Sequence, residues 1–415
     1  MNLTRRVALF PAVLLAAIAA VVLRATPDNP AVTPPTTTGT PDQTAAKALA
    51  GMSLPQRVGQ LFMVSTPADG SNASVVTGQI DHYHLGNVFL AGRSSAGVTA
   101  TAAVTAGLRT HVSTATTASV PLLIGTDQEG GYVQVLSGPG FSPIPTGLTQ
   151  GGWSTQTLTT DATAWARQLH AAGVNIDLAP VTDTVESPSF AAQNRPIGYF
   201  QREFGFDPAT VSSHSIAFTK GMTAAGVATA IKHFPGLGFV TGNTDDTVDV
   251  TDSITTRSAP AVGAFDAAIS AGAPAVMVSS ARYTKIDPAE IAAFSPTVML
   301  GMLRGDANFN GVIMTDSVAA AALSPYPPAT RALNFLSAGG DLVLTTDAST
   351  LPAMYDAVLA RAQTDSSFLG LVDTSAQRVL RLKAQLGLLP PISVPITPSP
   401  PSRDQPWGVR GKHHL

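Results

Sequence analysis

The segment that decides the fold spans residues 207–236 and reads DPATVSSHSIAFTKGMTAAGVATAIKHFPG. Its first part, 207–225, is long and alanine-rich enough to form a helix, and Gly226 stands where that helix must end and turn. A continuous run at 228–233 follows, which is typical of a strand buried on both faces of a parallel sheet. Polar and glycine residues come directly after it. The segment therefore predicts one helix–strand unit whose strand ends in charged side chains.

The same unit recurs along the chain. Four helices are expected, each followed by a glycine (Gly173, Gly226, Gly272 or Gly339), at 161–172, 207–225, 261–271 and 329–338. Eight short apolar runs are expected to be strands: 60–65, 86–91, 121–126, 174–180, 228–233, 275–280, 311–315 and 341–345. Because strands and helices alternate, we predict an α/β fold, a (β/α)8 TIM barrel forming a single catalytic domain. A doubly wound parallel sheet is the alternative, although no G-x-G-x-x-G motif follows the first run.

The N-terminal end departs from this pattern. Arg5 and Arg6 precede an uncharged apolar run at 7–23, which predicts a signal peptide or a membrane anchor over residues 1–25. A Pro/Thr-rich stretch at 26–45 follows, and such a composition predicts an extended, solvated linker. We therefore expect an exported protein that is either secreted or held at the cell surface.

The C-terminal end is also rich in proline. Residues 390–415 are expected to form a disordered tail. This leaves 46–389 for the barrel domain, whose last helix is expected at 373–386 with Asp373 as its N-terminal cap.

Composition excludes several classes of function. The chain has 415 residues, with 24 basic and 27 acidic side chains and a formal net charge of −3. This near-balance argues against a nucleic-acid partner, which needs a basic face to neutralise phosphates. The absence of cysteine excludes disulfides, thiolate metal sites and thiol nucleophiles.

Charged side chains are concentrated where the predicted strands end. The set comprises Asp127, Asp183, Arg195, Arg202, Lys232, His233, Asp245, Asp246, Asp249, Arg282, Asp316 and Asp347. The C-terminal ends of barrel strands converge on one mouth, so these groups are expected to form one site. Paired carboxylates are what glycosidic cleavage needs, and the surrounding cations suit a hydroxyl-rich substrate. Two alternatives stay open: Asp127 or Asp316 could cap a helix, and Lys232 with His233 could form ion pairs that lock the barrel.

A metal site is not expected. His82 and His84 share a face if they lie on a strand, but they precede the second run and so fall at the opposite end of the barrel. We expect the protein to need neither a metal nor an organic cofactor.

Three segments, in this order and spacing, resemble glycoside hydrolase family 3. They are DQEGG at 127–131, KHFPG at 232–236 and VIMTDS at 312–317, and the resemblance spans about residues 50–389. The subgroup that they resemble most is the single-barrel bacterial β-N-acetylglucosaminidases of the NagZ type. REFGFDP at 202–208 and the closing helix at 380–389 are also similar to the family.

The resemblance implies a role for each matched residue. Asp316 matches the nucleophile of a retaining reaction, which forms a covalent glycosyl-enzyme intermediate. Asp127, Arg202, Lys232 and His233 match positions that hold the hydroxyls of the non-reducing-end sugar. Lys232 and Arg202 can also keep nearby carboxylates ionised.

The chain departs from the subgroup at the proton donor. Typical members carry Asp-Ser-His in the loop after KHFPG, and that histidine is the general acid/base. Here Asn243, Thr244 and Asp245 stand at the corresponding spacing. We infer that Asp245 takes over as acid/base, with Asp246 as the fallback, and a neighbouring negative charge or burial must then raise its pKa.

A second departure concerns the sugar that is bound. Tyr132 and Val135 stand where the subgroup has arginines. We expect an exported retaining β-N-acetylglucosaminidase that acts on glycans such as peptidoglycan fragments, as a monomer, with a carbohydrate as its partner and an optional N-terminal membrane tether. The alternatives are a β-glucosidase or β-xylosidase of the same family and a glycan-binding protein without activity.

Overall fold

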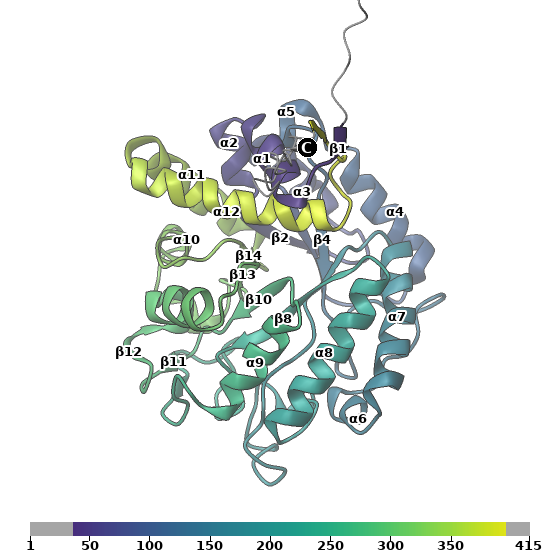
Figure 1. The fold of residues 1–415 in the computed structure, drawn as a ribbon, viewed down its shortest axis with the longest axis vertical. Coiled ribbons are helices and arrows are strands. Elements are labelled where there is room, and N and C mark those ends of the chain that lie inside the picture. The colour runs from purple at the N-terminus through teal and green to yellow at the C-terminus, as the bar shows by residue number, and fades with distance from the viewer. Residues whose placement is uncertain (1–35, 396–415) are drawn as a thin grey trace, which may run out of the picture. The chain divides into compact units, whose positions relative to one another are not determined.

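A computed structural model describes residues 36–395, in which eight parallel strands form one sheet (Figure 1). They are β2 (Phe62–Pro67), β3 (Asn87–Ala91), β4 (Leu123–Thr126), β7 (Ile176–Asp177), β8 (Ala228–Phe234), β10 (Ala275–Val278), β13 (Val312–Thr315) and β14 (Val343–Thr345). Their order in the sheet is β13-β10-β8-β7-β4-β3-β2-β14. A parallel bridge between Met314 and Leu342 joins the two ends of this order, so the sheet closes into a barrel. The eight predicted strands and the TIM-barrel prediction are confirmed.

Helices cover the outside of the barrel, as Figure 1 shows for α7, α8 and α9. The longer helices are α1 (Pro41–Ala50), α3 (Ala73–Tyr83), α4 (Gly97–Arg109), α7 (Thr155–Ala171), α8 (Pro208–Ala224), α9 (Pro260–Ser270), α10 (Pro328–Ser337), α11 (Leu351–Thr364) and α12 (Ser366–Gln385). Short helices are α2 (Leu54–Gly59), α5 (Thr114–Thr117) and α6 (Gly147–Gly151), and Thr297–Asp306 is a π-helix. The glycines expected after α7, α8, α9 and α10 all have positive φ, between 79° and 106°, the conformation in which glycine has no steric penalty.

Short strands lie outside the barrel. β5 (Gln128–Gly130) and β6 (Val133–Gln134) form an antiparallel hairpin directly after β4. β9 (Thr251–Asp252), β11 (Arg282–Tyr283) and β12 (Asp287–Ile291) form a three-stranded sheet, and β1 (Thr36–Thr38) pairs with β15 (Ser393–Pro395).

The barrel interior is packed with apolar side chains at one end. Met63, Phe89, Leu123, Ile176 and Met277 belong to this interior cluster. Val379 and Leu382 of α12 pack into the same cluster. Since α12 covers that end, the interior is left open at the C-terminal ends of the strands, where the active sites of TIM barrels lie.

The last helix differs from its prediction. It begins at Ser366 instead of residue 373, because Asp365 accepts hydrogen bonds from the backbone N–H groups of Ser367 and Phe368 and so caps it. Asp373 lies inside the helix and forms an ion pair with Arg57 at 3.0 Å.

The folded part also begins earlier than residue 46. Helix α1 starts at Pro41, within the stretch expected to be a linker, because Thr40 and Gln43 form a reciprocal cap with Pro41 in the first turn. The predicted signal or anchor at 1–25, the start of the linker and most of the predicted tail lie outside the described residues. Within residues 36–395, no helix combines the length and the apolar character that crossing a bilayer requires.

Candidate active site

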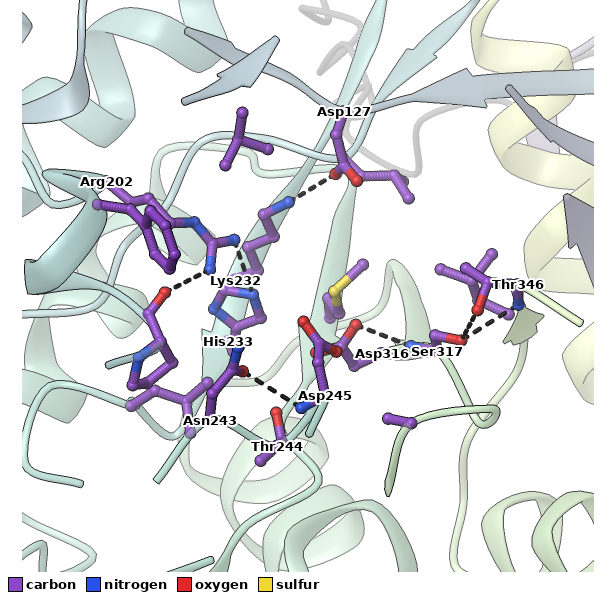
Figure 2. Close-up of a pocket in the computed structure, with 18 of the residues that line it drawn as sticks. Asp127, Arg202, Lys232, His233, Asn243, Thr244, Asp245, Asp316, Ser317 and Thr346 are labelled. Atoms are coloured by element: carbon purple, nitrogen blue, oxygen red, sulfur yellow. Dashed lines mark hydrogen bonds and ion pairs between the residues drawn. The ribbon is translucent and has the colours of Figure 1, made fainter. Parts of the chain in front are cut away.

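A cavity of about 580 Å³ opens at the C-terminal ends of the strands (Figure 2). All six residues predicted for the site line it: Asp127, Arg202, Lys232, His233, Asp245 and Asp316. They come from five places in the chain: Asp127 follows β4, Arg202 follows η1 (Gly198–Phe200), Lys232 and His233 lie near the end of β8, Asp245 lies in the loop between β8 and β9, and Asp316 follows β13. The structure brings every predicted site residue together, and their individual roles remain predictions.

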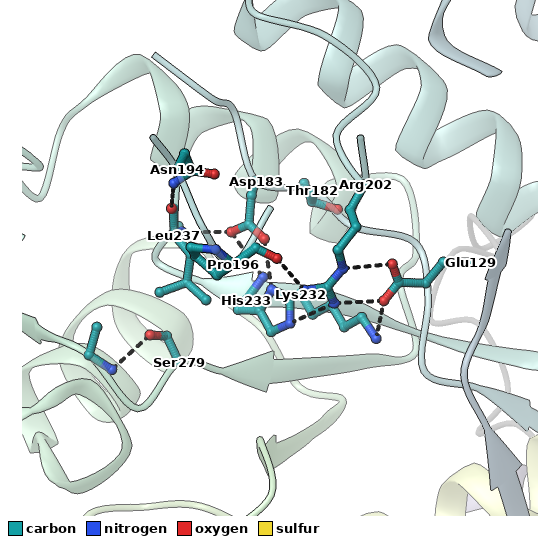
Figure 3. Close-up of polar contacts among 12 residues, drawn as sticks. Glu129, Thr182, Asp183, Asn194, Pro196, Arg202, Lys232, His233, Leu237 and Ser279 are labelled. Atoms are coloured by element: carbon teal, nitrogen blue, oxygen red, sulfur yellow. Dashed lines mark hydrogen bonds and ion pairs between the residues drawn. The ribbon is translucent and has the colours of Figure 1, made fainter. Parts of the chain in front are cut away.

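Two cations and two carboxylates form a network in the floor of this cavity. Arg202 donates two hydrogen bonds to Glu129, at 2.8 and 2.9 Å, and Lys232 Nζ lies 2.6 Å from the same carboxylate (Figure 3). Lys232 also donates to Asp127 at 2.7 Å. Burial opposes the charge on Glu129, but the two neighbouring cations prevail and lower its pKa to about 2. The network therefore holds both cations in fixed positions, as the ion-pair alternative for Lys232 anticipated.

His233 is held by a third carboxylate, that of Asp183. Its Nδ1 lies 2.7 Å from Asp183, and the other oxygen of Asp183 accepts hydrogen bonds from the backbone N–H groups of His233 and Leu237. Nε2 of His233 lies 3.4 Å from the Arg202 guanidinium. With Nδ1 engaged by Asp183, the opposite edge of the ring faces the cavity.

Asp316 and Asp245 both line the cavity, and their carboxyl groups lie next to each other (Figure 2). One oxygen of Asp316 accepts a hydrogen bond from the backbone N–H of Ser317 at 2.7 Å. Removal from water raises the pKa of Asp245, and the negative charge of Asp316 raises it further. The surroundings of Asp245 therefore favour its protonated form, as a general acid requires.

The neighbouring Asp246 does not line the cavity. Like Asp245 it is exposed, but its carboxylate accepts a hydrogen bond from the Thr247 hydroxyl at 2.7 Å. The peptide groups of Thr244 and Asp245, in contrast, are tied to the segment after β13. Of the two aspartates considered for the acid/base, only Asp245 is placed next to Asp316.

The two positions where the subgroup has arginines lie in different surroundings. Val135 is buried in the core. Tyr132, at the turn between β5 and β6, lines the cavity with more than half of its surface exposed. Arg93, which follows β3, also lines the cavity and donates a hydrogen bond to the backbone oxygen of Tyr132 at 2.7 Å.

Sequence reasoning assigned no role to three acidic residues that shape the site. Glu129 was visible within DQEGG, but its partners lie 73 and 103 residues away, so only the fold reveals the pairing. Asp183 was noted at the end of its strand without a role. Asp177 in β7 is fully buried beneath the network, and burial raises its pKa to about 8.

A metal centre has no counterpart among residues 36–395, where no group of three or more His, Asp or Glu side chains could hold an ion. His82 lies in the last turn of α3, and His84 follows that helix. The carboxylates that line the cavity can supply acid–base and nucleophilic chemistry.

A family model described as the glycosyl hydrolase family 3 N terminal domain matches residues 53–382. The chain belongs to glycosyl hydrolase family 3. The chain is thus a barrel of a glycosidase family, whose members hydrolyse O-glycosyl bonds.

One relative in sequence and two solved structures are similar to this chain. A beta-hexosaminidase from Stenotrophomonas maltophilia is 34% identical over 265 residues, which cover 62% of this chain and 76% of that protein. The crystal structure of a beta-N-acetylhexosaminidase from Beutenbergia cavernae is 53% identical, with a TM-score of 0.79, over 80% of this chain and 99% of that one. A family 3 beta-N-acetylglucosaminidase from Paenibacillus is 28% identical, with a TM-score of 0.73, over 81% of this chain and 63% of that one.

Proposed function

We propose that this family 3 enzyme is a β-N-acetylhexosaminidase that removes a terminal β-N-acetylglucosamine from the non-reducing end of a glycan, with retention of configuration. The observation that carries the proposal is the pairing of Asp245 and Asp316 across one cavity. The names of the similar proteins, beta-hexosaminidase and beta-N-acetylhexosaminidase, support the choice of sugar.

In the first step, a carboxylate oxygen of Asp316 attacks the anomeric carbon and forms a C–O bond. The glycosidic bond breaks, and Asp245 gives its proton to the departing oxygen. In the second step, Asp245 takes a proton from water, the water oxygen bonds to the anomeric carbon and the bond to Asp316 breaks. Two inversions at the same carbon restore the β configuration.

The network in the cavity floor supports this chemistry by holding the terminal sugar. Lys232 and His233 project polar atoms toward the cavity while Asp127, Glu129 and Asp183 fix their positions. These polar groups can hydrogen-bond to the hydroxyls of a sugar. A ligand without those hydroxyls would leave them buried without partners, which costs binding free energy, so the site selects against such ligands.

Release of an aryl aglycone from aryl β-N-acetylglucosaminide tests the proposal directly. The full chain should turn over this substrate, and Asp316→Ala should not. Faster turnover of the corresponding glucoside or xyloside would instead indicate a β-glucosidase or β-xylosidase. Binding of the glycan without turnover of any of the three would indicate a glycan-binding protein.

Water, not phosphate, is the proposed acceptor in the second step. A carboxylate at position 245 repels a phosphate dianion, which a neutral histidine would not do. Product analysis in phosphate buffer should therefore give free N-acetylglucosamine, and N-acetylglucosamine 1-phosphate would contradict this choice.

We also propose that the enzyme is exported and acts on glycans outside the cytoplasm, such as peptidoglycan fragments. The support is the basic pair and the uncharged run at 7–23. Cell fractionation tests it: activity should appear in the medium or the envelope fraction, and deletion of residues 1–25 should retain it in the cytoplasm.

A further inference from the structure

Asn194 lies in the loop between β7 and η1, and its side chain is completely buried. Its Nδ2 donates hydrogen bonds to the backbone oxygens of Leu237 at 2.7 Å and Val240 at 2.8 Å. Its Oδ1 accepts a hydrogen bond from the backbone N–H of Gly198 at 2.7 Å. Both hydrogens of the amide are therefore used, and the side chain joins two loops that are far apart in the sequence. Figure 3 shows the bond to Leu237.

The loop that contains Asn194 also holds Arg202. The Arg202 guanidinium donates a hydrogen bond to the backbone oxygen of Pro196 at 2.7 Å (Figure 3). The backbone N–H of Arg202 donates to the oxygen of Ile197 at 3.2 Å. Because Pro196 and Ile197 directly follow the residues next to Asn194, this loop places one of the two cations in the cavity floor.

The other loop begins shortly after β8 and carries Asp245. Leu237 lines the cavity, and its backbone N–H donates to Asp183 at 2.7 Å. At the next residue, Gly238, a Cβ would collide with the backbone oxygen of Thr184. The first turn of this loop is thus packed tightly against its neighbours, and the bonds from Asn194 fix the point from which the chain continues to Asp245.

We propose that Asn194 is a positioning residue that joins the loop of Arg202 to the loop of Asp245, so that the acid stands at the glycosidic oxygen of a sugar bound in the floor. This inference rests on the proposed function, because it takes Asp245 as the acid/base and the floor as the site of the terminal sugar. Asn194 is not among the residues that line the cavity, so it acts through the two loops without touching the substrate. A displacement of about 1 Å in a catalytic group can cost about a hundredfold in rate.

Loss of the Asn194 amide should displace the loop of Asp245 more than the floor. Arg202 is also held by two hydrogen bonds to Glu129, at 2.8 and 2.9 Å, and these do not involve Asn194. The backbone oxygens of Leu237 and Val240, in contrast, each lose a buried donor. Unpaired buried carbonyl groups favour other conformations of the loop, in which water or another donor reaches them.

The test compares two glycosides of N-acetylglucosamine in the full chain and its variants. The methyl glycoside has a leaving group that must be protonated, whereas 2,4-dinitrophenolate departs from its glycoside without a proton. Asn194→Ala should lower kcat/KM about ten- to hundredfold for the methyl glycoside and no more than about threefold for the dinitrophenyl glycoside. Asn194→Asp keeps the acceptor for Gly198 and loses at least one of the two donated bonds, so it should shift the ratio in the same direction.

Asn87→Ala is the matched control. Asn87 is also completely buried, and its Nδ2 donates to the backbone oxygens of Gln60 and Phe62 at 2.8 and 2.9 Å. It is the first residue of β3, so it lies at the end of the barrel away from the cavity. This variant should lower the melting temperature as Asn194→Ala does, but the ratio of kcat/KM for the two glycosides should equal that of the wild type.

Three results would overturn the inference. An equal loss on both glycosides in Asn194→Ala would mean that Asn194 supports the floor or the fold and not the acid. A wild-type ratio in both Asn194 variants would mean that the loop does not depend on the amide, and a shifted ratio in Asn87→Ala would mean that any loss of stability misplaces Asp245. Failure of the wild type on both glycosides would instead contradict the proposed function, whereas wild-type turnover with any of the three results overturns the positioning role alone.

Discussion

The backbone N–H of Ala321 donates a hydrogen bond to the backbone oxygen of Asp245 at 3.1 Å. The next residue, Ala322, donates to the oxygen of Thr244 at 3.0 Å. The loop that carries the proposed acid/base is thus fastened to the segment that follows β13 and Asp316. Because both bonds use main-chain atoms, they fix the two backbone segments that carry Asp245 and Asp316 relative to each other whatever the neighbouring side chains are.

Replacing Ala321 by proline deletes one of these bonds with little other change. Ala321 begins a 3-10 helix (η4, Ala321–Leu323), and Ala320 already has φ −58° and ψ 150°, the backbone that precedes proline readily. In Ala321→Pro, kcat/KM for methyl β-N-acetylglucosaminide should fall about ten- to hundredfold, since a misplaced acid protonates the leaving oxygen poorly.

The control for this variant is a substrate that needs no acid. In a 2,4-dinitrophenyl glycoside the leaving group is 2,4-dinitrophenolate, which departs without being protonated. The kcat/KM for this substrate should therefore change much less than that for the methyl glycoside. Equal losses on both substrates, with an unchanged melting temperature, would show that the bond does not act through Asp245.

Asp245→Ala tests the acid/base role itself. For substrates with poor leaving groups, kcat should fall about 10²- to 10⁴-fold. With a 2,4-dinitrophenyl glycoside, whose first step needs no acid, azide should restore turnover by attacking the intermediate and giving a β-glycosyl azide. The raised pKa of Asp245 places the alkaline limb of the wild-type profile above the ordinary range of an aspartate, and this limb should disappear in the variant. Asp246→Ala is the matched control, and a larger loss there than in Asp245→Ala would transfer the role to Asp246.

Glu129 is predicted to be essential for stability as well as for the site. Its carboxylate faces two buried cations, so Glu129→Gln leaves Arg202 and Lys232 without most of their compensating charge. The free energy of unfolding should fall by about 3 kcal/mol or more, as measured by urea denaturation. Asp306→Asn breaks an ion pair with Arg257 whose partners are about half exposed and should have little effect. Similar small effects in both variants would contradict the importance of the network.

Asp177 should make the protein less stable as the pH rises. Its pKa is raised from 3.8 to about 8, so between these values the folded chain holds a proton that the unfolded chain releases. The contribution of Asp177 to the free energy of unfolding is greatest below about pH 4. It decreases by up to about 1.4 kcal/mol for each pH unit between there and pH 8. In Asp177→Asn this contribution is absent, so the difference in unfolding free energy between variant and wild type should grow from pH 5 to pH 8. A constant difference would show that Asp177 is ionised throughout.

Much of the fold could be predicted because local patterns repeat. Each strand is a short apolar run buried on both faces, and glycines such as Gly173 and Gly226 mark the ends of the preceding helices. The helix boundaries were harder, since Asp365 and Asp373 are both plausible caps and only the packed chain shows that Asp373 pairs with Arg57.

The sequence predicts which residues form the site, but not which of them interact with each other. Residues at the C-terminal ends of the strands meet at the mouth of a barrel, so the sequence alone predicts that Asp127 and Asp316 belong to one site. Which carboxylate neutralises which cation depends on side-chain geometry across strands, so the central place of Glu129 was not foreseen. Likewise, the exposure of Tyr132 at the rim depends on the hairpin between β5 and β6, whose course the sequence pattern does not specify.

The central claim is that Asp316 forms a covalent bond to the sugar, and trapping this intermediate tests it most directly. Incubation with 5-fluoro-N-acetyl-β-glucosaminyl fluoride releases fluoride and leaves a slowly hydrolysed glycosyl ester, which mass spectrometry can locate after proteolysis. We predict a single added glycosyl unit on the peptide that contains Asp316, and none in Asp316→Ala. A label on Asp245 or another residue, or turnover that gives the α-anomer first, would contradict the account.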